Sequence, residues 1–170
     1  MIVVNLFGGP GSGKSTIMAG LFWLMRTKGI KCEMASEFVK ESVFAEDNYV
    51  FKDQGFVFSN QLKRLRVLEG KTDYAITDSP LLFSKIYGGY HSPEFHCYID
   101  KCINEFKNVN FIINRKVPFE KNGRVHSESE SAEIDTMIRL RLNIAGMPYT
   151  IIDGTTFAPL HIFRNLTRGD

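Results

Sequence analysis

Apolar residues follow two patterns along this chain, and the patterns predict its secondary structure. Short runs rich in Val, Ile and Phe are typical of strands that are buried on both faces. Longer segments with an apolar residue every three or four positions are typical of helices. The predicted strands cover residues 2–7, 30–35, 74–77, 109–114 and 148–152, and the predicted helices cover residues 15–28, 37–45, 53–69, 93–107 and 130–145, with one more helix after Pro80.

Strands and helices alternate at this spacing throughout the sequence. Such alternation predicts an α/β fold with a mainly parallel, five-stranded sheet and helices on both of its faces. Residues typical of helix ends support the bounds: Gly29 and Gly70 follow two of the helices, Ser36 can cap a third, and Pro80 suits the first turn of a fourth. The length suits a single domain, 1–170, and we find no internal repeat.

Residues 8–15 read Gly-Gly-Pro-Gly-Ser-Gly-Lys-Ser and complete the pattern of a phosphate-binding loop. The loop follows a predicted strand and precedes a predicted helix, so its backbone N–H groups and the positive end of the helix can hold a polyphosphate. Lys14 would reach the β- and γ-phosphates, and the Ser15 hydroxyl would join the shell of a Mg²⁺ ion. We therefore expect the loop to bind a nucleoside triphosphate with Mg²⁺ through Gly9, Pro10, Gly11, Ser12, Gly13, Lys14, Ser15 and Thr16.

Three further polar positions follow predicted strands: Glu37, Asp78 and Arg115. In parallel sheets ligands bind beyond the carboxyl ends of the strands, so these side chains are expected to lie near the phosphate loop. Asp78 is predicted to hold the Mg²⁺ shell through water, and the alternative is a helix cap. Glu37 is predicted to face the acceptor, and the alternative is an acid that complements a helix dipole.

Residues 115–129 form the least regular part of the sequence, with several basic side chains, a proline and an Asn-Gly pair. They are predicted to form a mobile basic lid beside the phosphates, and a solvated surface loop is the alternative. Arg124 is the first candidate for a phosphate contact, and Arg115 is the second.

Two predicted helices carry polar residues on or near apolar faces. Arg141 falls inside the apolar arc of residues 130–145, which is formed by Ile134, Met137, Ile138, Leu140, Leu142, Ile144 and Ala145. A guanidinium there must meet an anion, which is either a carboxylate or a bound phosphate. Gln54 and Gln61 lie close to the apolar face of residues 53–69, where an amide either reads a base edge or has a structural role.

Composition narrows the classes of protein that fit. A formal net charge of +2 by itself gives no argument for nucleic acid or membrane binding. No apolar stretch approaches the roughly 20 residues of a membrane span, and the N-terminal apolar run is expected to be a strand and not a signal peptide.

Three scattered cysteines point to a reducing compartment, so a cytoplasmic location is expected. Buried thiols and surface histidines are favoured over a zinc site made by His91, His96, Cys97 and Cys102.

A phosphate loop is shared by kinases, GTPases and motor ATPases. The chain has no Asn-Lys-x-Asp element of the type that GTPases use to read a base, and its third predicted strand ends in one acid followed by Ser79-Pro80, where motor ATPases usually carry paired acids. A small kinase needs an acid near Mg²⁺, a carboxylate that orients the acceptor and a basic lid; Asp78, Glu37 and residues 115–124 can supply them. An ATP-dependent switch or interaction module is the competing class.

Four segments resemble small phage P-loop kinases: residues 5–16 (Asn-Leu-Phe-Gly-Gly-Pro-Gly-Ser-Gly-Lys-Ser-Thr), 36–40 (Ser-Glu-Phe-Val-Lys), 61–62 (Gln-Leu) and 76–82 (Ile-Thr-Asp-Ser-Pro-Leu-Leu). The resemblance is nearest to hydroxymethyluracil DNA kinases, relatives of thymidylate kinase that phosphorylate the hydroxymethyl group of a modified thymine in phage DNA. The same landmarks, together with residues 117–119, 122–124 and 146–149, are similar to nicotinamide riboside kinases. The chain departs from many thymidylate kinases because Ser79-Pro80 replaces an Asp-Arg type pair.

This resemblance implies a kinase that transfers the γ-phosphate of ATP to a hydroxyl of a nucleoside-like acceptor, most specifically 5-hydroxymethyluracil in phage DNA, in the host cytoplasm. A free nucleoside or nicotinamide riboside is the small-molecule alternative. The implied metal ligands are Ser15 and Asp78, with Glu37 as the base carboxylate, and the implied catalytic set is Lys14, Glu37, Asp78 and Arg124. A DNA acceptor would also need a basic track, for which the candidates besides the lid are Lys63, Arg64, Arg66, Arg164 and Arg168.

Overall fold

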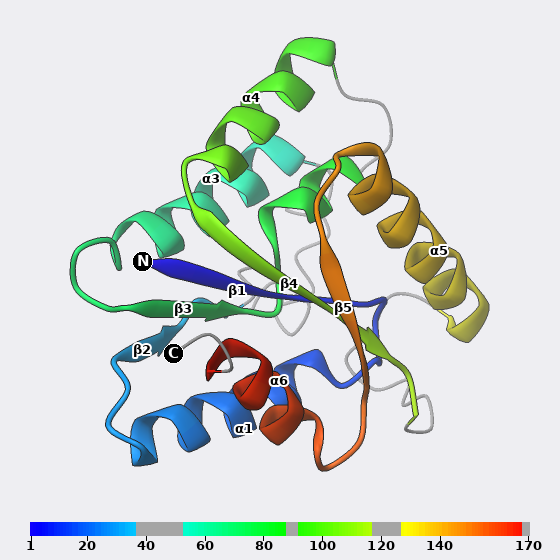
Figure 1. Ribbon diagram of the computed structural model, residues 1–170. Helices are drawn as coiled ribbons and strands as arrows, with labels where there is room; N and C mark the ends of the chain where they lie inside the picture. The colour runs from blue at the N-terminus through cyan, green and yellow to red at the C-terminus, as the bar shows by residue number, and fades with distance from the viewer. Residues whose placement is uncertain (37–52, 88–91, 117–126, 168–170) are drawn as a thin grey trace.

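The computed structural model describes residues 1–36, 53–87, 92–116 and 127–167. These residues form one sheet with strands β1 (Ile2–Phe7), β2 (Cys32–Met34), β3 (Tyr74–Thr77), β4 (Lys107–Asn114) and β5 (Tyr149–Asp153). The strands lie in the order β2-β3-β1-β4-β5, and every neighbouring pair is parallel (Figure 1). The predicted α/β fold with a five-stranded parallel sheet is confirmed.

Helices cover both faces of this sheet. Helices α1 (Lys14–Thr27) and α6 (Ala158–Thr167) pack on one face, while α3 (Gln54–Arg66), α4 (Pro93–Asn104), α5 (Glu128–Ile144) and the 3-10 helix η2 (Leu81–Lys85) pack on the other (Figure 1). The helix predicted over residues 37–45 lies outside the described residues.

The alternation of side chains along β1 builds the two halves of the core. Val3 and Phe7 pack into the cluster under α3, α4 and α5, and Val4 and Leu6 pack into the cluster under α1 and α6. Successive residues of a strand point to opposite faces of the sheet, so a strand covered on both sides needs apolar residues at nearly every position. This is the pattern from which the strand was predicted.

Side-chain caps fix where three helices begin. The carboxylate of Asp53 accepts the N–H of Phe56 (2.9 Å) at the start of α3, and the hydroxyl of Ser92 accepts the N–H of Phe95 (3.2 Å) at the start of α4. Ser127 forms a capping box with the residue three positions later, so α5 begins at residue 128, two residues earlier than predicted.

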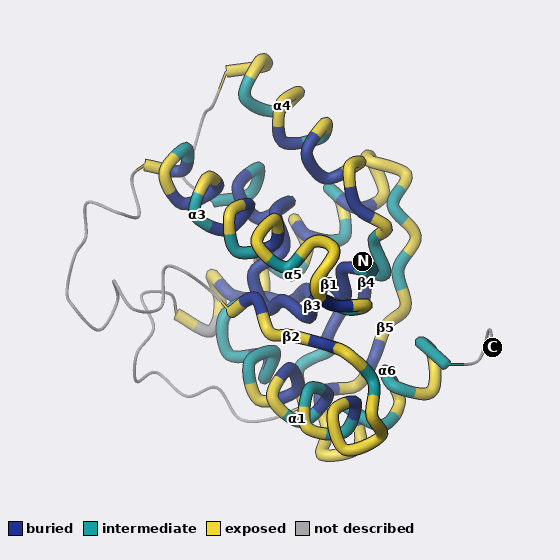
Figure 2. The backbone as a smooth tube through the Cα atoms, turned by 90° about the vertical axis from the view of Figure 1, so that its left-hand side faces the viewer, coloured by how far each residue is buried: buried dark blue, intermediate teal, exposed yellow. Residues whose placement is uncertain are grey.

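Three features differ from the predicted elements. Residues 158–167 form α6, which was not predicted from the sequence pattern; Ala158 and Ile162 are its buried residues. Pro80 lies at the N-cap of the five-residue η2 and not in the first turn of an α-helix. The apolar arc predicted for α5 was wrong in part, since Met137, Leu140 and Ile144 are exposed. Figure 2 shows exposed stretches in yellow along α5. A helix that lies on a sheet buries a narrow stripe, here Ile134, Ile138 and Leu142.

Candidate active site at the phosphate loop

The phosphate loop joins β1 to α1 at the carboxyl edge of the sheet. Gly13 lies at the N-cap of α1 with φ +88°, a conformation that a residue with a Cβ atom rarely adopts. Gly9 is required for another reason: a Cβ atom there would lie 2.6 Å from the hydroxyl oxygen of Ser131 and would also overlap the Ser131 carbonyl oxygen. The glycine pattern of the loop therefore meets both a backbone and a packing requirement.

Lys14 opens α1 and folds back over the loop. Its ammonium donates to the carbonyl oxygens of Gly8 (2.6 Å) and Gly9 (3.1 Å) and lies 5.8 Å from the centre of the Phe83 ring. These contacts hold the only cationic side chain of residues 8–16 above the loop. The ammonium is therefore placed where a bound polyphosphate would meet it.

Ser15 and Asp78 meet at the end of β3. The Ser15 hydroxyl donates to Oδ2 of Asp78 at 2.5 Å, and Asp78 is only 3% exposed. A hydroxyl and a carboxylate oxygen side by side form a hard-oxygen donor set of the type that Mg²⁺ prefers, so these residues fit the predicted metal site. The alternative, a helix cap, is not what Asp78 provides, because η2 has Pro80 at its N-cap and no side-chain cap.

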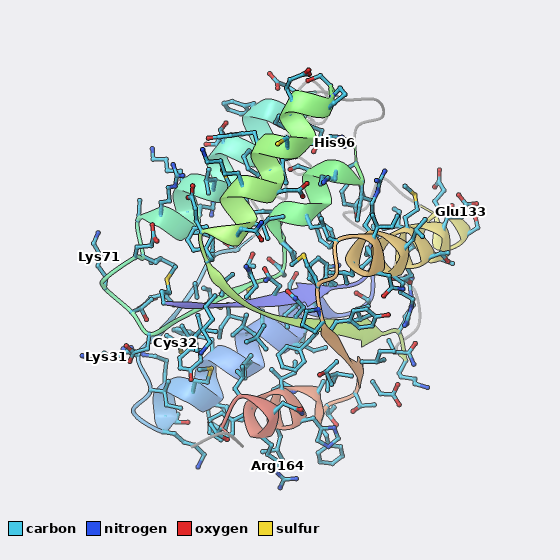
Figure 3. The ribbon with its side chains drawn as sticks, turned by 45° about the horizontal axis from the view of Figure 1, so that its top comes forward. Lys31, Cys32, Lys71, His96, Glu133 and Arg164 are labelled. Atoms are coloured by element: carbon cyan, nitrogen blue, oxygen red, sulfur yellow. The ribbon has the colours of Figure 1, made fainter. Side chains whose placement is uncertain are left out.

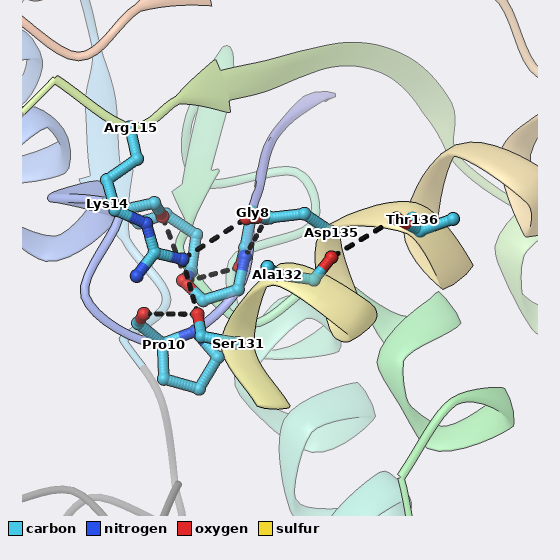
Figure 4. A network of polar contacts seen from close by, with 10 residues as sticks. Gly8, Pro10, Lys14, Arg115, Ser131, Ala132, Asp135 and Thr136 are labelled. Atoms are coloured by element: carbon cyan, nitrogen blue, oxygen red, sulfur yellow. Dashed lines mark hydrogen bonds and ion pairs between the residues drawn. The ribbon is translucent and has the colours of Figure 1, made fainter. Parts of the chain in front are cut away.

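Helix α5 contacts the first half of the phosphate loop through two side chains. Oδ1 of Asp135 accepts the N–H of Gly9 at 2.5 Å, and the hydroxyl of Ser131 donates to the carbonyl oxygen of Pro10 at 2.6 Å. Figure 4 shows both side chains pointing from α5 to the loop. The sequence analysis missed Ser131 and Asp135. The available signal was their i, i+4 spacing beside the apolar stripe of α5.

Arg115 completes this network from the end of β4. Its Nη2 donates to Oδ2 of Asp135 (3.1 Å) and to the hydroxyl of Ser131, and its side chain is 15% exposed (Figure 4). The prediction that Arg115 lies beside the phosphate loop agrees with this position. The contact that it makes there is with a carboxylate of α5.

A family model described as an AAA domain matches residues 3–158, which include the phosphate loop and all five strands except the first residue of β1. The chain belongs to this AAA domain family. Among solved structures, deoxyadenosine kinase from M. mycoides with bound dATP has a similar fold, with a TM-score of 0.60, 20% sequence identity, and coverage of 98% of this chain and 99% of that chain. No curated protein matches the sequence. The P-loop NTPase fold, of the type found in nucleoside kinases, is thereby shown.

Gln61 of this AAA domain lies behind the carboxyl ends of two strands. Its Nε2 donates to the carbonyl oxygen of Ala35 (3.2 Å) after β2 and to the hydroxyl oxygen of Thr77 (3.1 Å) in β3. The amide is 3% exposed, and its Oε1 is buried without a hydrogen-bond partner in the part of the chain that is described. The sequence left two roles open for Gln61, reading a base edge or holding the fold. The contacts of its amide nitrogen are of the second kind, because they join β2 to β3.

Glu37 and Arg124 lie outside the described residues, as do residues 117–126 of the predicted lid. The chain preceding Glu37 is described: the N–H of Ala35 donates to the carbonyl oxygen of Ile76 at 2.8 Å, so β2 leads to the same edge of the sheet as Asp78. The roles of Glu37 and Arg124 therefore stay predictions.

Arg141 is half-buried and lies six residues beyond Asp135 in α5, which corresponds to about 9 Å along the helix axis. Within residues 1–36, 53–87, 92–116 and 127–167, no carboxylate forms an ion pair with it. The carboxylate alternative is therefore not found within those residues, and a contact of Arg141 with a bound phosphate stays a prediction. The arginine that pairs beside the phosphate loop is Arg115.

The cysteines and histidines show no shared site in the described part of the chain, where no three His, Cys, Asp or Glu side chains are arranged to hold a metal ion. His91 is outside it. Cys32 and Cys102 are buried and Cys97 is exposed, and burial raises the pKa of the Cys32 thiol. None of the helices that the structure describes is long and apolar enough to cross a membrane.

Proposed function

We propose that this AAA domain is a kinase that transfers the γ-phosphate of Mg-ATP to a hydroxyl of a nucleoside-like acceptor in the cytoplasm. The observation that carries the proposal is the contact between Ser15 and Asp78 next to Lys14, because two oxygen groups that suit Mg²⁺ and a cation then lie at one phosphate loop. The nucleoside kinase fold supports the same reaction class.

The proposal gives each residue of the site a separate task. Lys14 stabilises the charge that spreads over the transferred phosphoryl group, and the loop N–H groups hold the phosphates in line with the acceptor. Ser15 and Asp78 would hold Mg²⁺, which neutralises charge on the phosphates when bound. Glu37 is proposed to orient and deprotonate the acceptor hydroxyl. Arg124, in a lid formed by residues 115–129, is proposed to contact the phosphates.

The finer proposal is that the acceptor is a hydroxymethyl pyrimidine in DNA. A base must leave its stack to reach a phosphate loop, and the flanking backbone then needs basic contacts. Arg64 supports this proposal, because its guanidinium reaches the Ser36 hydroxyl (3.4 Å) at the edge of the sheet where Glu37 follows. Arg66 supports it less, since it pairs with Glu105 at 2.9 Å.

One comparison of acceptors tests both levels of the proposal. Transfer of labelled γ-phosphate is measured to hydroxymethyl-deoxyuridine as nucleoside, as monophosphate and within an oligonucleotide, and to nicotinamide riboside, each at low and high salt. Transfer to the oligonucleotide that falls steeply with salt supports the DNA acceptor. Transfer only to small molecules refutes the DNA acceptor and supports a small-molecule kinase. ATP hydrolysis with no phosphorylated product from any acceptor favours the alternative, an ATP-dependent switch.

The two acids can be separated by their variants. Asp78→Asn is expected to raise the Mg²⁺ concentration required for half-maximal activity, and Glu37→Gln is expected to lower transfer at unchanged nucleotide Kd. Asp73→Asn, an exposed position before β3, serves as the matched control. The reverse pattern would show that the two roles have been exchanged.

A further inference from the structure

The first half of the phosphate loop is held from outside by α5. Asp135 binds the N–H of Gly9 and Ser131 binds the carbonyl of Pro10, so both polar groups of this half-turn that face α5 are satisfied by one helix. The hydroxyl and backbone of Ser131 also occupy the space that a side chain at Gly9 would need. The position of the loop therefore depends on that of α5.

The Asp135 carboxylate has an electrostatic cost at this position. It lies one hydrogen bond from a loop that is proposed to bind a triphosphate, and like charges at such short range repel. Arg115 lies on the other carboxylate oxygen at 3.1 Å, with the two side chains 15% and 27% exposed. The Gly9 N–H can therefore bind a charged acceptor, the Asp135 carboxylate, while the net charge of the Asp135–Arg115 pair stays close to zero.

We propose that Asp135 and Arg115 act together as positioning residues for nucleotide binding. Asp135 fixes the loop through Gly9, and Arg115 cancels the carboxylate charge that would otherwise oppose the phosphates. Arg115 thus acts through Asp135 and not as a phosphate ligand. The inference rests on the proposed nucleotide binding and adds two residues that the phosphate-loop motif does not contain.

The charge argument makes Asp135→Asn a compensating change. The variant keeps an oxygen for the Gly9 N–H and removes the negative charge. Arg115→Met alone leaves Asp135 uncompensated, and the double variant Arg115→Met/Asp135→Asn removes both charges while the loop keeps its acceptor. Glu133→Gln is the matched control, because it removes an exposed acid from the same helix without touching the loop.

The experiment measures the Kd of ATP, ADP and adenosine by calorimetry on the full chain and its variants, with thermal unfolding to show that each is folded. Arg115→Met is expected to weaken ATP binding about tenfold, which is about 1.4 kcal/mol, with a smaller effect on ADP and none on adenosine. The double variant is expected to recover ATP affinity to within about threefold of the wild type. Glu133→Gln is expected to leave all three affinities unchanged.

Two results would overturn the inference and leave the proposed function standing. A double variant as weak as Arg115→Met would mean that Arg115 contacts the phosphates directly. An equal loss for ATP and adenosine would mean that the pair only maintains the fold. If the wild-type chain binds adenosine but no nucleotide, the proposed function itself fails, and the inference fails with it.

Discussion

Lys14 and Gln61 are two polar side chains of the site whose hydrogen-bond partners within the protein are known. Lys14 contacts the carbonyls of Gly8 and Gly9, groups that any phosphate loop presents. Gln61 contacts Ala35 and Thr77, groups that meet only because β2 and β3 lie side by side. We propose a chemical role for Lys14 and a structural role for Gln61, so their variants are expected to fail in different assays.

Lys14→Ala is expected to lower phosphoryl transfer by two or more orders of magnitude, because a charge partner of the transition state is lost. The fold is expected to remain, since the described hydrogen bonds of the ammonium are to groups of the loop. Turnover under saturating ATP and acceptor measures the effect, and Lys31→Ala, an exposed lysine before β2, is the control. Near-normal transfer by Lys14→Ala would remove the loop from the catalytic mechanism.

Gln61→Glu is expected to make stability depend on pH. Only a protonated carboxyl can donate to the Ala35 carbonyl, so folding raises the pKa of the introduced group above its unfolded value of about 4.3. Its contribution is then present at low pH and is lost as pH rises, and we expect the variant to be about 2–4 kcal/mol less stable than the wild type at pH 8. Urea unfolding at pH 5 and pH 8 measures this difference. Gln61→Met, which has no charge, should show the same change at both values; an equal change in Gln61→Glu would contradict the prediction.

At the scale of elements, the helix layers on the two faces of the sheet contact the phosphate loop in different ways. Helix α1 begins in the phosphate loop and packs against α6, while α5 touches the loop from the opposite face of the sheet (Figure 1). The loop therefore lies between the two layers. Helix α6 packs against α1 and β5 in the second half of the core, so its effect on the site is expected to pass through stability.

Ile162→Ala tests the packing of α6. The side chain is completely buried in the cluster with α1, so its truncation is expected to destabilise the protein by about 2–4 kcal/mol. Ile144→Ala removes the same atoms from a side chain that is 69% exposed and is expected to cost less than about 1 kcal/mol. Denaturant unfolding of both variants gives the comparison, and equal effects would mean that α6 does not pack as described.

The distribution of charge over the whole molecule restricts the proposed DNA track. Lys63, Arg64 and Arg66 belong to α3 and Arg164 belongs to α6, and these helices cover opposite faces of the sheet. Figure 3 shows Arg164 pointing outward at the bottom of the view, away from His96 on α4 at the top. One strand of nucleic acid at the site cannot follow both faces, so only the α3 side is compatible with a track that starts at Ser36.

Charge reversal at Arg64 and Arg164 tests this restriction. Arg64→Glu is expected to lower transfer to a hydroxymethyl oligonucleotide about three- to tenfold and to reduce its salt dependence, because one phosphate contact is lost. Arg164→Glu is expected to change transfer to the same oligonucleotide less than twofold. Transfer to the free nucleoside is measured with both variants, and a loss there by Arg64→Glu would show damage to the site and not to a track.

The sequence by itself determined the parallel sheet, the phosphate loop and the meeting of Ser15 with Asp78. These follow from local rules: buried strands are apolar throughout, the loop pattern needs its glycines in order, and parallel strands end at one edge. Only the tertiary structure decided the partners of Arg115 and Gln61 and the contact of Asp135 with Gly9, which are 126 residues apart. Such pairings depend on the position and orientation in which α3 and α5 pack on the sheet. Helical periodicity tells which residues share a face of a helix, but it does not say which residue of a distant loop that face will meet.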